Sequence, residues 1–241
     1  MLETKPAILA VGESHARKGL EKIPSTTKRF TEQLLPKLPE RSTDLVLELW
    51  EAQGACGKVE QKVAQQQKQV TKNQAKSNTN EFVLLARAAK ARGMIPHVLR
   101  PTCDEYQHIA KAGPDAPLEM LTMITRLTTR KVKQLMEQRR NPKTGKAPFA
   151  DPLLVAYGGG MHNDLKPQEN REQWSFGPEL HQAFEGRYVE LDLIVPEYIR
   201  DQPPWSDLPW YPHFDRKAAP DRATLLRQSP GSYVLIFPTT R

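Results

Sequence analysis

The chain has 241 residues, of which 38% are hydrophobic and 26% are charged. That is enough for one sizeable core, and the sequence excludes a membrane span because no run approaches the roughly 18 apolar residues that a span needs. The formal net charge of +7 favours acidic partners in general, but no RNA-binding or zinc-finger motif organises the basic residues, so we expect no specific nucleic-acid partner.

Short apolar segments and helical patterns alternate along the chain. The apolar segments predict strands at residues 7–11, 44–50, 94–100, 153–157, 188–195 and 233–237. Most lack strict polar alternation, which is typical of parallel strands covered by helices on both faces. Helical patterns occur at 25–35 and 81–91, with Ser25 and Asn80 as the expected caps, and at 117–139. The alternation predicts an α/β fold, a mostly parallel sheet flanked by helices, in a single domain spanning 1–241.

Three segments do not fit this alternation. Residues 58–80 follow the second strand and are rich in Gln, Lys and Asn, which indicates a solvated helix or a mobile insertion. Residues 139–148 are most simply a solvated basic loop. Residues 196–230 form a proline-rich, aromatic C-terminal segment, which we expect to be an irregular cover that packs over the domain or lines a pocket.

The two cysteines, Cys56 and Cys103, each follow a predicted strand and could meet at one sheet edge. Two reduced, partly buried thiols are the simpler interpretation, and a disulfide is the alternative. A disulfide would indicate an oxidising compartment. The chain as it stands favours the cytoplasm, whereas removal of an export signal would make it an exported protein.

Two glycine-histidine turns carry the chemistry, Gly12-Glu13-Ser14-His15 and Gly158-Gly159-Gly160-Met161-His162. Each follows a predicted buried strand, and ligands of open α/β sheets bind beyond the carboxyl ends of the strands. Consecutive glycines suit a place where the backbone must approach a ligand. We therefore predict catalytic roles for His15, His162 and Glu13, and substrate contacts from Ser14, Gly159, Gly160 and Asn163.

Glu48 and Arg100 are expected to complete this site. Glu48 lies in the apolar run Leu45–Trp50, where an ionised carboxylate is costly unless it is paired, so we predict a catalytic role for it. The alternative is a carboxylate that is solvated or paired for packing only. Arg100 ends the third strand and either binds a substrate oxyanion or is simply exposed. The motifs of serine hydrolases with a nucleophile elbow, P-loop enzymes, zincins and dinucleotide binders do not occur.

The two turns and the Glu48 strand resemble the superfamily that joins erythromycin esterases, ChaN-like haem-binding lipoproteins and TraB/Tiki proteases. The matching segments are Ala10–His15, Leu45–Leu49 and Val155–His162, which cover about the first two thirds of the chain. The resemblance implies that His15 acts as general base with Glu48 as its partner, and that His162 stabilises the reacting centre or binds metal. It also implies a tentative metal site formed by His15, Glu48 and His162, and either a divalent metal ion or haem as the cofactor.

Three functions follow as hypotheses. The first is a hydrolase of ester or amide bonds, esterase-like or metallopeptidase-like, that acts on a small-molecule or peptide substrate and is assisted by metal in one version. The second is a non-catalytic haem-binding or metal-binding protein of the ChaN-like type. The third is a catalytically silent interaction domain. The fold alone does not distinguish these three functions, because one fold can carry many functions. The sequence leaves the substrate and the oligomeric state open.

Overall fold

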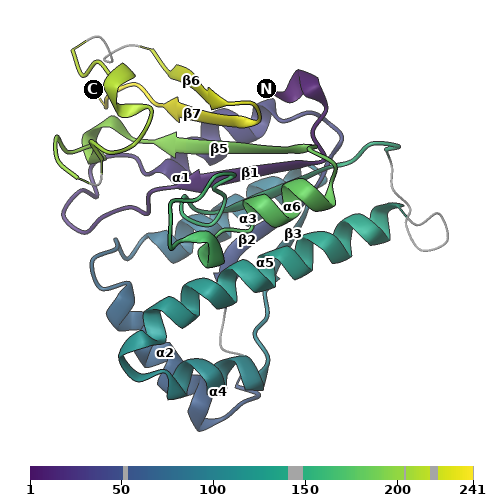
Figure 1. Cartoon of the computed structure of the whole chain (residues 1–241), viewed down its shortest axis with the longest axis vertical. Helices are drawn as coiled ribbons and strands as arrows, with labels where there is room; N and C mark the ends of the chain where they lie inside the picture. Colours follow the sequence, from purple (N-terminus) through teal and green to yellow (C-terminus); the bar gives the residue numbers. More distant parts are fainter. Residues whose placement is uncertain (51–53, 141–148, 204, 218–221, 241) are drawn as a thin grey trace.

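The fold is a seven-stranded sheet with helices on both faces, an α/β architecture (Figure 1). The computed structural model describes the chain except residues 51–53, 141–148, 204, 218–221 and 241. The strand order is β3-β2-β4-β1-β5-β7-β6, and all neighbouring strands are parallel except β6 and β7. The strands are β1 (Ile8–Glu13), β2 (Ser42–Trp50), β3 (Ile95–Leu99), β4 (Leu153–Gly159), β5 (Tyr188–Ile194), β6 (Thr224–Ser229) and β7 (Ser232–Ile236).

Helices cover the two faces through separate apolar clusters. The α-helices of the described residues are α1 (Thr26–Arg29), α2 (Lys58–Val70), α3 (Asn78–Ala91), α4 (Cys103–Lys111), α5 (Ala116–Arg140) and α6 (Gly177–Ala183). On one face Phe30, Phe82 and Leu85 pack with Leu9 and Val155, whereas on the other α5 and α6 pack over the opposite side of the strands. Both faces of the central strands are therefore buried, which explains their continuous apolar runs.

Each of the six predicted strands coincides with an observed strand, but two details of the helices differ from expectation. The helix expected at 81–91 begins at Asn78 with Ser77 in the cap position, so Asn80 lies inside α3. The helix capped by Ser25 does form, with the Ser25 side chain accepting from the backbone N–H of Lys28. It continues as a π-helical turn, Phe30–Leu34, and a 3₁₀ turn, Leu35–Lys37, rather than as one regular helix.

The expected insertion at 58–80 is mostly ordered helix. Helix α2 packs beside α4, and the two lie together at the lower end of the molecule in Figure 1. Val63 is fully buried there, and Lys62 Nζ donates to the carbonyl of Ala110 at 2.7 Å. A disulfide joins Cys56, just before α2, to Cys103 at the start of α4. The simpler expectation of two free thiols is therefore wrong for this structure. The disulfide and the packing against α4 hold α2 in place, so it is not a mobile insertion.

The other two unusual segments also contain ordered parts. The expected basic loop mostly lies outside the described residues, but Arg139 is paired with the buried Asp44, so it is not a solvated charge. The C-terminal cover is irregular over much of its length and buries Trp205 and Trp210 against the core. Its end forms β6, an edge strand that the sequence analysis did not predict. Within the described residues, none of the helices has the length and apolarity to cross a membrane.

Candidate functional site

The ends of β1 and β4 lie side by side, and small residues allow their close approach. In the parallel register Gly12 pairs with Gly158, and Glu13 pairs with Gly159. A Cβ at Gly12 would lie 2.7 Å from the Gly160 Cα and 2.5 Å from an Asp192 carboxylate oxygen. No larger side chain fits at position 12 without displacing these atoms. Gly12 therefore allows the two glycine-histidine turns to lie in close contact.

Glu13 holds His15 in a defined orientation. Glu13 is the last residue of β1 and is buried, and its carboxylate contacts His15 Nδ1. This contact leaves Nε2 of the imidazole free for other partners, with 28% of the side chain exposed. Burial alone lowers the pKa of His15, but the Glu13 charge and hydrogen bond, together with the Glu48 charge, raise it to about 9. His15 is therefore protonated at neutral pH.

Glu48 lies near the end of β2, and its carboxylate contacts the backbone of β4. The backbone N–H of Gly159 donates to Glu48 Oε2 at 2.5 Å. A Cβ at Gly158 would lie 2.7 Å from the Glu48 Cβ and would overlap its carboxylate. Because charge-assisted hydrogen bonds of this kind are short and strong, Gly158 and Gly159 together fix the carboxylate over the strand end.

His162 is buried, and its tautomer is set by the backbone. Its Nδ1 lies 2.7 Å from the carbonyl oxygen of Trp174, which only accepts hydrogen bonds, so Nδ1 carries the proton. Thr125 Oγ1 in α5 donates to the same carbonyl at 2.6 Å and lies 3.1 Å from Nδ1. The other ring nitrogen, Nε2, lies 3.6 Å from Glu48 Oε1.

The two histidines and Glu48 converge on one point beside Gly159. A Cβ placed on Gly159 would lie 3.4 Å from Glu48 Oε2, 3.5 Å from His15 Nε2 and 3.9 Å from His162 Cδ2. All three side chains therefore surround the face of Gly159 that a side chain would cover. The glycine-histidine turns and the β2 glutamate thus form one centre.

The partners within this centre differ from those that the resemblance implies. The carboxylate in contact with His15 is Glu13, whereas Glu48 lies beside His162 and acts on His15 only through its charge. Strand order explains the difference, because β4 lies between β1 and β2 and separates His15 from the β2 backbone.

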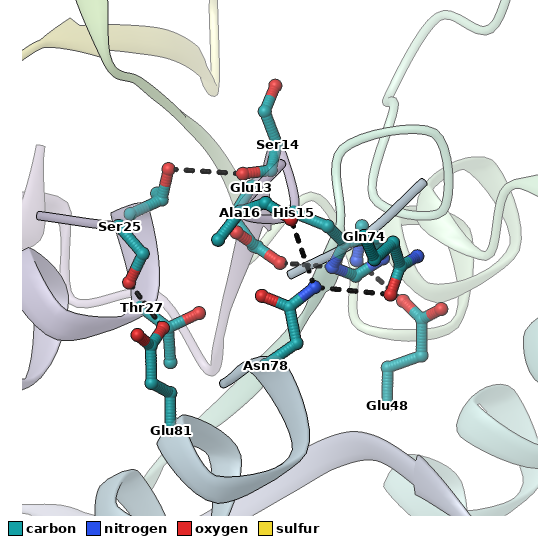
Figure 2. Close-up of polar contacts among 12 residues, drawn as sticks. Glu13, Ser14, His15, Ala16, Ser25, Thr27, Glu48, Gln74, Asn78 and Glu81 are labelled. Carbon is teal, nitrogen blue, oxygen red and sulfur yellow. Dashed lines mark hydrogen bonds and ion pairs between the residues drawn. The ribbon is translucent and has the colours of Figure 1, made fainter. Parts of the chain in front are cut away.

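Most of the residues expected to contact substrate lie elsewhere. The Ser14 side chain points away from His15 and Glu48 in Figure 2, and its carbonyl accepts from Thr26 Oγ1. Arg100 is exposed after the edge strand β3. Asn163 is buried, and its amide donates to Asp192 at 2.9 Å, so it belongs to the packing below the turn. Gly160 donates its N–H to the Glu13 carbonyl and ties the two turns together.

The donor atoms expected to bind a metal ion do not form a metal-binding cluster. A cluster that could hold a metal ion needs three ligand atoms close together. Within the described residues, the cluster whose ligand atoms all lie within 4.8 Å of one another is Asp164, Glu190 and Asp192. It contains none of His15, Glu48 and His162. Burial and the Glu190 charge raise the pKa of Asp164 to about 7, so protonation removes part of the negative charge of that cluster at neutral pH. The expected set therefore does not fit a metal ion, and haem binding stays a prediction without a supporting contact.

Sequence reasoning missed the residues that position the histidines. Trp174 and Thr125 come from a 3₁₀ turn and from the middle of α5, and neither belongs to a recognisable motif. Tyr198 in the C-terminal cover is buried, and burial with the Glu13 charge raises its pKa to about 12. The cover thus lies close to the buried side of the Glu13–His15 pair.

Comparisons with known proteins add little to this geometry. No protein-family model and no curated protein matches the chain. The solved structure of the type III effector HopBA1 is similar over 97% of this chain and 88% of that chain, with 9% sequence identity and a TM-score of 0.43. At these values the likeness says nothing about the chemistry of this chain.

Proposed function

We propose that this protein hydrolyses ester or amide bonds at the centre formed by His15, Glu48 and His162. The observation that carries the proposal is the convergence of all three side chains around Gly159. Such a hydrolysis needs a base that activates water and a hydrogen-bond donor for the carbonyl oxygen, and the two histidines can take these two roles.

His162 is the general base in this proposal. Its Nδ1–H is held by the Trp174 carbonyl, which leaves Nε2 to accept a proton from an attacking water. Glu48 Oε1, 3.6 Å from Nε2, stabilises the imidazolium that forms. Because His15 is protonated at neutral pH, the base role that the resemblance implies for His15 passes to His162.

His15 supports the other half of the reaction. Its Nε2–H donates to the carbonyl oxygen of the substrate and stabilises the negative charge that develops there when water adds to the carbonyl carbon. Collapse of the tetrahedral intermediate breaks the ester or amide bond, and the leaving alcohol or amine takes its proton from His162. Glu13 keeps His15 protonated and oriented through this cycle.

The test is a pair of glycine substitutions in the same turn. In Gly159→Ala the added methyl group occupies the position shared by His15, Glu48 and His162, so we expect at least a hundredfold loss of kcat/KM on the best substrate of an ester and peptide panel. Gly160→Ala is the matched control, because its nearest neighbour, the Glu13 backbone N, is 3.8 Å away. Circular dichroism confirms that both variants fold.

Two results would contradict the proposal. One is the absence of hydrolysis by the native protein on every ester and peptide tested. The other is a substrate that is hydrolysed equally well by the native protein and by His162→Ala, since removal of a general base costs about 10² to 10⁴ in rate.

A further inference from the structure

A cavity of about 510 Å³ opens next to the segment that carries His15. Its walls come from two stretches of chain, residues 18–28 and residues 72–81. We call it the lysine cavity, because its lining includes the five lysines Lys18, Lys22, Lys28, Lys72 and Lys76. This volume lies within the range of about 300–1,000 Å³ that is typical of small-ligand pockets.

The charge of the lysine cavity is strongly unbalanced. Two glutamates, Glu21 and Glu81, also line it, so five lysines against two glutamates leave an excess of three positive charges. Both glutamates already accept hydrogen bonds inside the protein, Glu81 from Ser25 Oγ and Glu21 from the backbone N–H of Gly19. Since a concave surface focuses the field of like charges, the cavity attracts anions.

The cavity and the hydrolytic centre share a wall. The residues after His15 form backbone hydrogen bonds with the segment just before α3. The Ala16 carbonyl accepts from Ala75 N at 2.7 Å, and Lys18 N donates to Asn73 O at 3.1 Å. Gln74, which lines the cavity, accepts from Asn78, whose amide also donates to the Ala16 carbonyl (Figure 2). The Cα atoms of His15 and Lys18 are at most about 11 Å apart, because consecutive Cα atoms are 3.8 Å apart.

We infer that the lysine cavity binds an anionic group, a carboxylate or a phosphate, of the molecule whose ester or amide bond is cleaved beside Gly159. The inference rests on the proposed function and names its substrate class. A small molecule or peptide that carries the anionic group at the end of an extended chain can reach both places at once. The dimensions favour such a group over a nucleic acid, because the lysines line one cavity rather than a long stripe.

The binding test needs no substrate turnover. Inorganic pyrophosphate and succinate are titrated separately into the native protein by calorimetry, which distinguishes phosphate from carboxylate recognition. In Lys22→Gln/Lys72→Gln we expect the affinity for the preferred anion to fall at least tenfold. The control Lys37→Gln/Lys90→Gln removes the same charge from two exposed lysines outside the cavity lining and should bind like the native protein.

The kinetic test uses two p-nitrophenyl esters of equal chain length that differ in charge, the neutral octanoate and the anionic suberate monoester, whose extended chain can carry the carboxylate from the ester to the cavity. In the cavity variant we expect KM for the anionic ester to rise about tenfold with kcat unchanged, and no change for the neutral ester. The control variant should hydrolyse both esters normally.

The outcomes separate this inference from the proposed function. Anion binding that the cavity variant weakens, without hydrolysis of any ester, supports the cavity and contradicts the hydrolase. If the protein hydrolyses the neutral and the anionic ester equally well in both variants and binds neither anion, the anion-binding role of the cavity is contradicted and the proposed hydrolase function is supported. Binding of a single-stranded RNA that depends on Lys22 and Lys72, when neither small anion binds, also overturns the inference.

Discussion

At the scale of single residues, the charge state of His15 decides how the centre works. Its imidazole lies between two carboxylates, Glu13 in direct contact and Glu48 farther away, and their charge outweighs the effect of burial. A histidine that stays protonated donates a hydrogen bond but cannot accept a proton from water. The pair Glu13–His15 therefore suits an electrophilic role, and His162, with its proton fixed on Nδ1, suits the role of base.

The pH dependence of hydrolysis should report this charge state. The proposed mechanism uses the protonated form of His15, whose pKa is raised to about 9, so kcat/KM should fall as pH rises through about 9. Glu13→Gln removes the charge that raises this pKa the most, so the fall should move to lower pH, and kcat/KM at pH 8 should drop at least tenfold. The measurement is a kcat/KM profile between pH 6 and 10.

The control for the pH profile is Glu32→Gln, which removes an exposed glutamate that faces Lys28. Its profile should overlay that of the native protein. An alkaline limb that stays in place in Glu13→Gln would show that the limb belongs to another group.

Gly158→Ala should damage the site by displacing Glu48. The new methyl group would overlap the carboxylate and approach its Cβ to 2.7 Å, so Glu48 must leave its hydrogen bond with Gly159 N. Forced overpacking typically costs about 1–3 kcal/mol of stability, and we expect activity to fall at least tenfold as well. Urea unfolding and turnover are measured together. A Gly158→Ala protein as stable and active as Gly160→Ala would mean that the Glu48 position is not fixed by this contact.

At the scale of elements, the sequence predicts the strands better than it predicts how they are ordered. Central strands such as β1 and β4 show as apolar runs because both of their faces are buried. The edge strand β6 was missed because none of its residues is buried, which leaves no apolar run to detect. The partner of His15 could not be predicted either, because the position of β4 between β1 and β2 depends on tertiary packing. The glycine-histidine turns needed no strand order, since both follow parallel strands and reach the same sheet edge.

The disulfide gives a prediction for the pair of elements that it joins. Cys56 and Cys103 are 47 residues apart in sequence and close a loop that contains α2 and α3. A bridge over such a loop stabilises a protein by about 2–4 kcal/mol, chiefly by restricting the unfolded chain. Urea unfolding with dithiothreitol should therefore show a loss of this size. Cys56→Ser/Cys103→Ser should show the same loss and no further response to the reductant, whereas a response in this variant would disprove the assignment.

At the scale of the whole molecule, α5 braces the sheet at two distant places. Thr125 hydrogen-bonds the Trp174 carbonyl beside His162, and Arg139 forms two 3.0 Å hydrogen bonds with Asp44 of β2. Fourteen residues separate them, about 21 Å along a helix. The helix thus connects the end of the sheet that carries His162 with a buried ion pair near the start of β2, so the orientation of His162 depends on a helix that is fixed at both points.

The buried ion pair should contribute to stability in a pH-dependent way. Asp44 is 1% exposed; burial alone raises its pKa, but His97, Arg139 and Thr43 lower it to about 2, against 3.8 in the unfolded chain. A lowered folded-state pKa gives stability that is present above pH 3.8 and is lost as pH falls through 2, here about 2 kcal/mol. Arg139→Met leaves the Asp44 charge with His97 and Thr43 only, and should cost about 3–5 kcal/mol at pH 7.

Urea unfolding at pH 7 and pH 2 tests this, with Lys133→Met as the control because its pair with Glu179 is exposed and should contribute under about 1 kcal/mol. The difference between native protein and Arg139→Met should shrink at pH 2, where the Asp44 carboxyl is increasingly protonated in both. Asp44→Leu/Arg139→Met should recover much of the loss, since no unpaired charge is then buried. If Arg139→Met costs no more than Lys133→Met at pH 7, the ion pair does not hold α5 against the sheet, and α5 must be fixed by its apolar face alone.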